Sequence, residues 1–194
     1  MCVPRTSSNG SEPRWEALYE AAASQAGYFT TKQAKTAGYS PQLLQFYIRE
    51  RRVERSSRGI FRLVHFPPTD REDLVPIWLW SEGKGVFSHE TALAIHGLSD
   101  LLPAKRHLTL PLDWSRRRLR PPKGVVLHHA DLTENERAWF GPIPVTTPLR
   151  SVLDCIQGHV SKEFTDQAIA QGVRRRLFTR AEVRATSRAQ RRSA

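Results

Sequence analysis

Histidine and acidic side chains occur in the middle of the chain at spacings that invite a metal-binding or catalytic role. Ser88-His89-Glu90 matches the start of the H-E-x-x-H zinc motif, but Leu93 stands where the second histidine is needed. His96 falls on the same face of a predicted helix as His89, yet about 10 Å of helix rise separates them, too far for one shared metal. We therefore predict packing or capping roles for these two histidines.

Two other groups of candidate ligands give equally weak signals. His128 and His129 are adjacent on a predicted strand, with Asp131 close behind, so they point to opposite faces and at most one can join a common site. Glu82 and Lys84 are residue types found in metal-dependent nuclease centres, but this pair at this spacing is common by chance. We predict no metal site at either place.

Established motifs for catalysis are absent from the sequence. It contains no glycine-rich phosphate loop of the Walker type and no G-x-S-x-G nucleophile elbow. It also lacks the pair of aspartates after Gly-Ser that a nucleotidyltransferase needs. We therefore predict no catalytic residues, no metal, no cofactor and no enzymatic activity.

Positive charge is concentrated at the two ends of the chain. Thirty Lys and Arg residues against nineteen Asp and Glu residues give a net charge of +11. The net charge is +5 over residues 1–69, −1 over 70–170 and +7 over 171–194. A charge run is often only a solvated face, but two basic regions also favour an anionic partner.

Length and composition restrict the class of protein further. The 194 residues allow one domain or two small ones. No apolar run approaches the roughly 20 residues that span a bilayer, and the N-terminus lacks the apolar centre of a secretory signal, so we expect a cytoplasmic protein. Cys2 and Cys155 are the only cysteines, too few for a disulfide framework or a cysteine-based zinc site.

Three short helices are predicted in the N-terminal third, from apolar spacing and from residues that favour helix starts. Apolar residues at spacings of three and four indicate a helix over 14–26. Thr30 with Gln33 forms a capping box for a second helix. Ser40 with Pro41 starts a third helix.

A basic β-hairpin is predicted directly after the third helix, because apolar and polar residues alternate on both sides of a Ser/Gly turn. Three short helices followed by such a hairpin are typical of a winged helix-turn-helix, whose third helix enters the DNA major groove. Side chains on the outer face of the third helix suit contacts to bases: Gln42, Gln45, Phe46 and Arg49. Other basic side chains suit contacts to phosphates: Lys32, Arg51, Arg52, Arg55 and Arg58. The alternative is that this small domain only packs on the rest of the chain or on a protein partner.

Helices mixed with strands are predicted after a proline-containing break near residue 66. Strands are expected at 107–110 and 125–128, separated by a polar loop over 114–120, and the whole chain is predicted to be α+β. A helix with a good start at Thr179 is expected to fray beyond Val183 or to fold on an anionic partner. The domains expected are a disordered tail over 1–13, a winged helix-turn-helix over 14–66, a second domain over 70–180 and an Arg-rich helix or tail over 181–194.

An unusual basic run lies in the predicted loop of the second domain. It could be a solvated loop, a second contact to the DNA backbone or a docking site for an acidic protein surface. The run consists of Arg116, Arg117, Arg118 and Arg120.

Several segments resemble the AbiEi family of antitoxins. GYFTT at 27–31, AGYS at 37–40 and RGIFRL at 58–63 are similar to its N-terminal domain. FSHETALAIHGLSD at 87–100 and VTTPLRSVLD at 145–154 are similar to its C-terminal domain. The resemblance implies a transcriptional autorepressor that binds double-stranded operator DNA with inverted repeats and counters a nucleotidyltransferase toxin encoded beside it. Two alternatives stay open: an antitoxin acting mainly by protein–protein interaction, and a solitary DNA-binding regulator.

Overall fold

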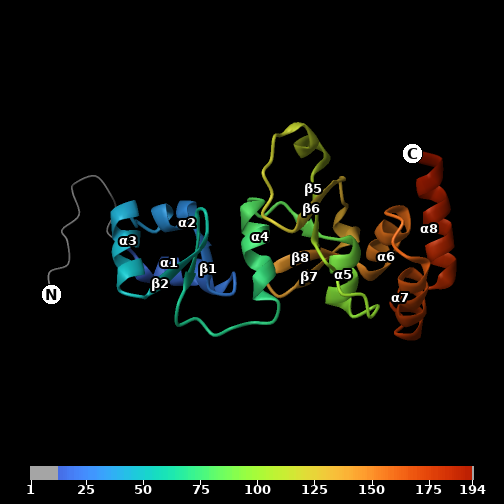
Figure 1. The fold of residues 1–194 in the computed structure, drawn as a ribbon, viewed down its shortest axis with the longest axis horizontal. Coiled ribbons are helices and arrows are strands. Elements are labelled where there is room, and N and C mark those ends of the chain that lie inside the picture. The colour runs from blue at the N-terminus through green and yellow to red at the C-terminus, as the bar shows by residue number, and fades with distance from the viewer. Residues whose placement is uncertain (1–12, 194) are drawn as a thin grey trace. The chain divides into compact units, whose positions relative to one another are not determined.

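Two compact units make up the chain, Met1–Gly83 and Lys84–Ala194. The computed structural model describes residues 13–193 (Figure 1), with side chains described through residue 188. Both helices and sheets occur in each unit, which confirms the predicted α+β class.

The first unit combines short helices with a three-stranded antiparallel sheet. The strand order is β1-β3-β2, so the hairpin strands β2 and β3 pair with each other and β3 also pairs with β1. The elements in chain order are α1 (Trp15–Ala23), β1 (Tyr28–Thr30), α2 (Thr31–Thr36), α3 (Pro41–Arg49), β2 (Val53–Ser57), β3 (Ile60–Leu63), a 3-10 turn (Glu72–Leu74) and α4 (Val75–Trp80).

The helix starts of this unit follow the predicted capping residues. The Thr30 hydroxyl accepts a hydrogen bond from the Gln33 amide, and the Gln33 side chain accepts from the Thr30 amide in return. At α3 the Ser40 hydroxyl accepts from the Leu43 amide, and Pro41 occupies the first turn. These bonds satisfy amides that lack a partner within the helix.

The first unit continues beyond the proline-containing segment near residue 66, where the sequence places a boundary. Leu74, Val75 and Leu79 are buried, and α4 contacts β1 and β3. Arg62 of β3 also bonds Glu72 at 3.0 Å, which ties the start of this segment to the sheet. Apolar burial and this ion pair therefore place α4 with the N-terminal sheet.

A five-stranded mixed sheet forms the centre of the second unit. Its order is β6-β5-β4-β8-β7, with parallel pairs β5–β6 and β4–β8 and antiparallel pairs β4–β5 and β7–β8. Only the strands at 107–110 and 125–128 were predicted, and both are present. The elements are β4 (Val86–Phe87), α5 (His89–His96), β5 (Arg106–Leu110), a 3-10 helix (Leu112–Arg116), β6 (Val125–His129), a 3-10 turn (Glu134–Glu136), β7 (Arg137–Phe140), β8 (Ile143–Thr146), α6 (Pro148–Gln157), α7 (Lys162–Arg174) and α8 (Arg180–Ser193).

Helices α6, α7 and α8 gather at one end of the second unit and share an apolar core with α5 (Figure 1). Phe178, which precedes α8, and Val183 in its first turn are both buried in this core. Helix α8 does not end at Val183 but continues to Ser193. Alanine and arginine favour helix formation, which accounts for the continuation.

Candidate functional site

Helix α3 presents a polar face to solvent and an apolar face to the core. Gln42, Gln45 and Arg49 are exposed, whereas Leu43 and Leu44 are buried. The buried pair anchors the helix against the cluster that includes Phe29 and Phe61, so the three polar side chains share one outward surface. This arrangement can offer amide and guanidinium groups to a partner.

Phe46 departs from the predicted outward position. Its side chain is half-buried, packs against the core cluster and meets the Tyr47 ring edge-on, with centroids 5.9 Å apart. Phe46 lies between the two faces of α3, and burial of an aromatic ring is favourable wherever core atoms are in reach. Only part of its ring faces solvent.

The basic hairpin predicted after α3 is present, and the four arginines predicted to contact phosphate are exposed. Arg51, Arg52, Arg55 and Arg58 all reach solvent. The Arg52 guanidinium lies 5.6 Å from the centroid of the Tyr47 ring, which links the start of the hairpin to α3.

The turn of the hairpin is held against the start of α2. The Thr31 amide donates to the Gly59 carbonyl at 2.9 Å, and the Thr31 hydroxyl donates to the same oxygen at 3.2 Å. Gly59 adopts a φ of +75°, a conformation that favours glycine. These bonds bring exposed Arg58 close to the helix that carries exposed Lys32. The structure thus gathers two of the predicted phosphate-contacting residues.

Arg62, in the same hairpin, has a different role. It is 9% exposed, and its guanidinium donates to the Phe66 carbonyl and bonds Glu72. The ring of Tyr28 lies 5.6 Å from the guanidinium carbon. Arg62 therefore holds the sheet together and does not contribute to the exposed basic surface.

The second basic run also faces solvent, but it is not wholly an irregular loop. Arg116 ends a 3-10 helix, and Arg117 lies 4.0 Å from the centroid of the buried Trp114 ring. Packing of this tryptophan orders the segment, which the polar sequence pattern did not predict. The exposed members of the run are Arg116, Arg117, Arg118 and Arg120.

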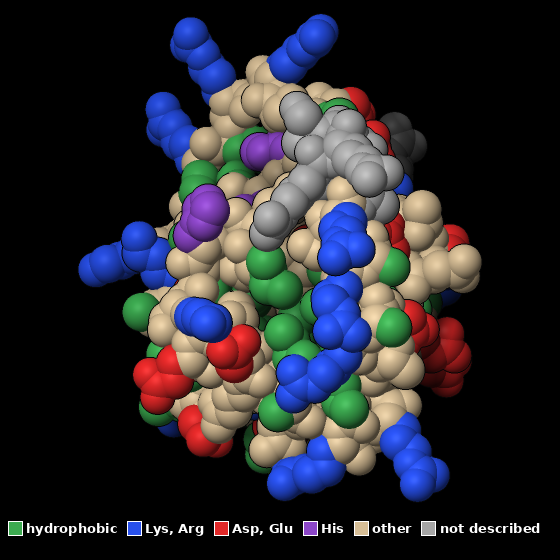
Figure 2. Space-filling model, turned by 90° about the vertical axis from the view of Figure 1, so that its right-hand side faces the viewer, with side chains coloured by type: hydrophobic (Ala, Val, Ile, Leu, Met, Phe, Trp, Pro, Cys, Tyr) green, Lys and Arg blue, Asp and Glu red, His purple; other side chains and the backbone are tan. Residues whose placement is uncertain are grey.

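Helix α8 carries a further basic surface. A hollow beside it is lined by Ile156, Val183, Arg184, Ser187 and Arg188. Figure 2 shows Lys and Arg side chains gathered next to hydrophobic side chains on this face.

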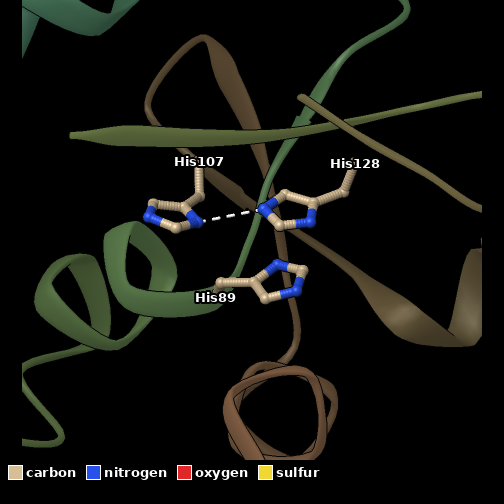
Figure 3. Close-up of side chains that lie close together, drawn as sticks. All are labelled: His89, His107 and His128. Atoms are coloured by element: carbon tan, nitrogen blue, oxygen red, sulfur yellow. Dashed lines mark hydrogen bonds between the residues drawn. The ribbon is translucent and has the colours of Figure 1, made fainter. Parts of the chain in front are cut away.

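Three histidines from three different elements meet in the second unit (Figure 3). His107 Nδ1 lies 3.0 Å from His128 Nε2, and the His89 ring stacks on the His128 ring with centroids 3.6 Å apart. One ring nitrogen from each histidine lies within 4.8 Å of the other two. We call His89, His107 and His128 the histidine cluster.

Neighbouring polar groups orient the histidine cluster. His89 Nδ1 lies 2.9 Å from the Ser88 hydroxyl, which accepts a hydrogen bond from the Thr109 hydroxyl at 2.7 Å. His107 Nε2 lies 3.8 Å from a carboxylate oxygen of Glu90. The cluster is therefore held at the junction of α5, β5 and β6.

Burial keeps the histidine cluster neutral at physiological pH. Desolvation, followed by the neighbouring histidines, lowers the pKa of His89 to about 3. The same causes lower the pKa of His128 to about 4. Desolvation also lowers the pKa of His107, although Glu90 opposes the shift. A neutral imidazole keeps a free lone pair on one ring nitrogen, which can accept a hydrogen bond or bind a metal ion.

The sequence alone did not reveal the histidine cluster, because no motif or spacing places His107 beside His89 and His128. The signal is the strand register: Thr109 pairs with His128 on parallel strands, and His107 precedes Thr109 by two residues, so both histidines share a face. His129 lies on the other face, as the alternation predicts. His96 is not part of the cluster. Its Nε2 hydrogen-bonds the Thr146 carbonyl at 2.7 Å, which is a packing role, as predicted.

Comparisons with known proteins bear on the first unit. Residues 16–64 match the model of a family described as "Transcriptional regulator, AbiEi antitoxin", which confirms the resemblance over this segment. No curated protein matches the sequence. Among solved structures, the chain is similar to the RV2827C protein from Mycobacterium tuberculosis, at 12% identity and a TM-score of 0.48, over 92% of this chain and 83% of that chain. Between residues 13 and 193, the structure contains no helix long and apolar enough to span a membrane.

Proposed function

We propose that the protein is a DNA-binding transcriptional regulator of the AbiEi type, and that residues 14–66 act as a winged helix-turn-helix. The observation that carries the proposal is the exposed polar face of α3, with Gln42, Gln45 and Arg49, next to a hairpin of exposed arginines. The family match over residues 16–64 supports it.

In this proposal α3 enters the major groove and reads bases. Gln42 and Gln45 pair an acceptor and a donor with adenine, and Arg49 pairs bidentately with guanine. The exposed part of the Phe46 ring contacts a thymine methyl group. The side chains that contact phosphates are Lys32, Arg51, Arg52, Arg55 and Arg58.

The regulatory role that we propose is autorepression in the cytoplasm. The chain binds an operator of inverted repeats upstream of its own gene, where two copies match the symmetry of the site. As an antitoxin it counters a nucleotidyltransferase toxin encoded beside it, and it has no catalytic activity of its own.

A second candidate function rests on the exposed arginine run of the second unit. Arg116, Arg117, Arg118 and Arg120 form a dense positive surface within a segment of the chain whose net charge is −1. Such a surface favours an acidic protein partner, as in an antitoxin that neutralises its toxin by direct contact. The same surface would suit a second contact to the DNA backbone.

A binding titration on the protein's own upstream DNA tests the proposed function. We expect tighter binding to that DNA than to scrambled DNA of equal length, because specific contacts add to the phosphate contacts that both duplexes share. Fluorescence anisotropy with both duplexes at one salt concentration measures the ratio. Equal, weak binding to both duplexes would contradict the proposal and favour the protein-partner alternative.

Replacing Arg49 and Arg58 separately distinguishes base reading from phosphate contact. Arg49→Ala should cost about 1–3 kcal/mol on upstream DNA and much less on scrambled DNA, because its partner is a base. Arg58→Ala should weaken binding to both duplexes alike. Equal losses on the two duplexes for Arg49→Ala would rule out a base-reading role for this side chain.

A further inference from the structure

We propose that the histidine cluster of His89, His107 and His128 binds one divalent transition-metal ion of the zinc type. Neutral imidazole nitrogens are good ligands for Zn²⁺ and its neighbours in the first transition row. This site lies wholly within the second unit and does not depend on the proposed DNA-binding function.

Two of the three ligands already have the spacing that a metal needs. Zn–N bonds of about 2.0–2.1 Å place two nitrogen ligands of a tetrahedral ion about 3.3 Å apart. His107 Nδ1 and His128 Nε2 lie 3.0 Å apart. A small outward movement of either ring would therefore admit an ion between them.

The third ligand reaches the ion by rotation of one side chain. The three candidate nitrogens lie within 4.8 Å of one another, so the longest separation must shorten by up to about 1.5 Å for tetrahedral coordination. The His89 ring stacks on the His128 ring, and a methyl group added at Gly158, the residue that ends α6, would lie 3.4 Å from His89 Cδ2. Rotation about its two side-chain bonds exchanges this stacking for a metal bond.

The surroundings of the cluster suit metal ligands. Histidines that bind metals commonly direct their second ring nitrogen at a carboxylate or another oxygen acceptor. If Nδ1 of His107 binds the ion, its Nε2 faces Glu90 at 3.8 Å. Three protein ligands also leave a fourth position of the ion open, as in zinc sites that take water or an exchangeable ligand.

The backbone conformation at His89 sets the direction of its side chain. His89 adopts a φ of 51°, in the left-handed region, as do six other non-glycine residues among those described. Here the conformation directs His89 from the start of α5 toward His107 and His128 (Figure 3).

Metal titration of the full chain, without an affinity tag, tests the proposal. Cys2→Ser should be present in every sample, because the Cys2 thiol could bind Zn²⁺ by itself. Isothermal titration calorimetry should detect about one tight equivalent of Zn²⁺ per chain. Co²⁺, used as a probe, should give the intense visible absorption of a four-coordinate ion, and Zn²⁺ should abolish it by displacement.

Variants of the cluster identify the ligands. His107→Ala should lower the affinity for Zn²⁺ by about 100-fold or more, and Glu90→Gln should lower it by about 10- to 100-fold because Glu90 acts through His107. His129→Ala is the matched control, since it removes a histidine from the opposite face of the same strand. The control should retain the affinity of the parent within about threefold.

Two results would overturn the proposal. One is a parent protein that takes up no Zn²⁺ and gives only the weak absorption of hydrated Co²⁺. The other is a His107→Ala variant that binds Zn²⁺ as tightly as the parent. Circular dichroism verifies the fold of each variant, and if His107→Ala does not fold, Glu90→Gln and the parent titration still decide. The experiment contains no DNA, so failure of the proposed function would leave its result unchanged.

Discussion

Raising the salt concentration from about 50 to about 200 mM should weaken binding to any DNA duplex about 500-fold per bound chain, if five side chains contact phosphate. Each phosphate contact releases condensed counterions and contributes about −0.9 to the slope of log affinity against log salt, so five contacts give about −4.5. The five are Lys32, Arg51, Arg52, Arg55 and Arg58, all of which are exposed.

The slope also separates the surfaces that could contact DNA. The double variant Arg55→Ala/Arg58→Ala should reduce the magnitude of the slope by about 2, because two phosphate contacts are lost. If the arginine run of the second unit also contacts the backbone, the parent slope should approach about −8, and replacing Arg116 and Arg118 should reduce it by about 2. A parent slope near zero would show that the basic hairpin does not meet phosphates.

Local sequence signals predicted the first unit well, because its elements begin at residues whose side chains satisfy free backbone amides. Thr30 with Gln33 and Ser40 with Pro41 mark the starts of α2 and α3, and both sets of bonds are present. The alternation on either side of Gly59 predicted the β2–β3 hairpin. These are interactions between residues close in sequence, so a single sequence contains them.

Features that depend on distant residues were not predicted. Strand β4 is only two residues long, and it forms by pairing with residues of β5 and β8 that lie more than twenty residues away along the chain. Strand β8 pairs with β4 across that distance and also pairs locally with β7. The position of α4 follows from its packing on β1 and β3, which no local pattern reports. Phe46 is half-buried for the same reason, since core atoms from other elements reach the side of α3.

The histidine cluster illustrates this limit most directly. His89, His107 and His128 come from a helix start and two strands, and their spacing in sequence matches no metal motif. Strand alternation correctly left at most one of His128 and His129 for a common site. That His128 and His107 share one face of the sheet follows only from the parallel register between β5 and β6. A single sequence does not contain this register.

Phe29→Ala should destabilise the first unit by about 3–5 kcal/mol, the usual cost of removing a fully buried aromatic side chain. Phe29 is 0% exposed and stacks on Phe61 with ring centroids 5.7 Å apart. It belongs to the core cluster that also contains Leu18 of α1 and Leu44 of α3, so the substitution would weaken the core on which the proposed reading helix packs. Because domains are stable by only about 5–15 kcal/mol, a large share of that stability would be lost.

Urea denaturation measures the loss, and hydrogen exchange locates it. Exchange should rise in peptides from residues 13–83 and stay unchanged in peptides from 84–193, because the affected core belongs to the first unit alone. Phe29→Leu should cost less than Phe29→Ala, since most of the volume is kept. Glu20→Ala, on the exposed side of α1, is the control and should change stability by less than about 0.5 kcal/mol.

The same variants separate folding from recognition. Phe29→Ala removes no proposed DNA contact, so any loss of affinity must arise from unfolding of the unit that carries α3. The loss should therefore be similar on upstream and scrambled DNA and should shrink at lower temperature, down to the temperature of maximum stability. Arg49→Ala should show the opposite pattern, with stability retained and the preference for upstream DNA reduced. Full DNA affinity in a Phe29→Ala protein whose first unit is unfolded would show that binding does not require this fold.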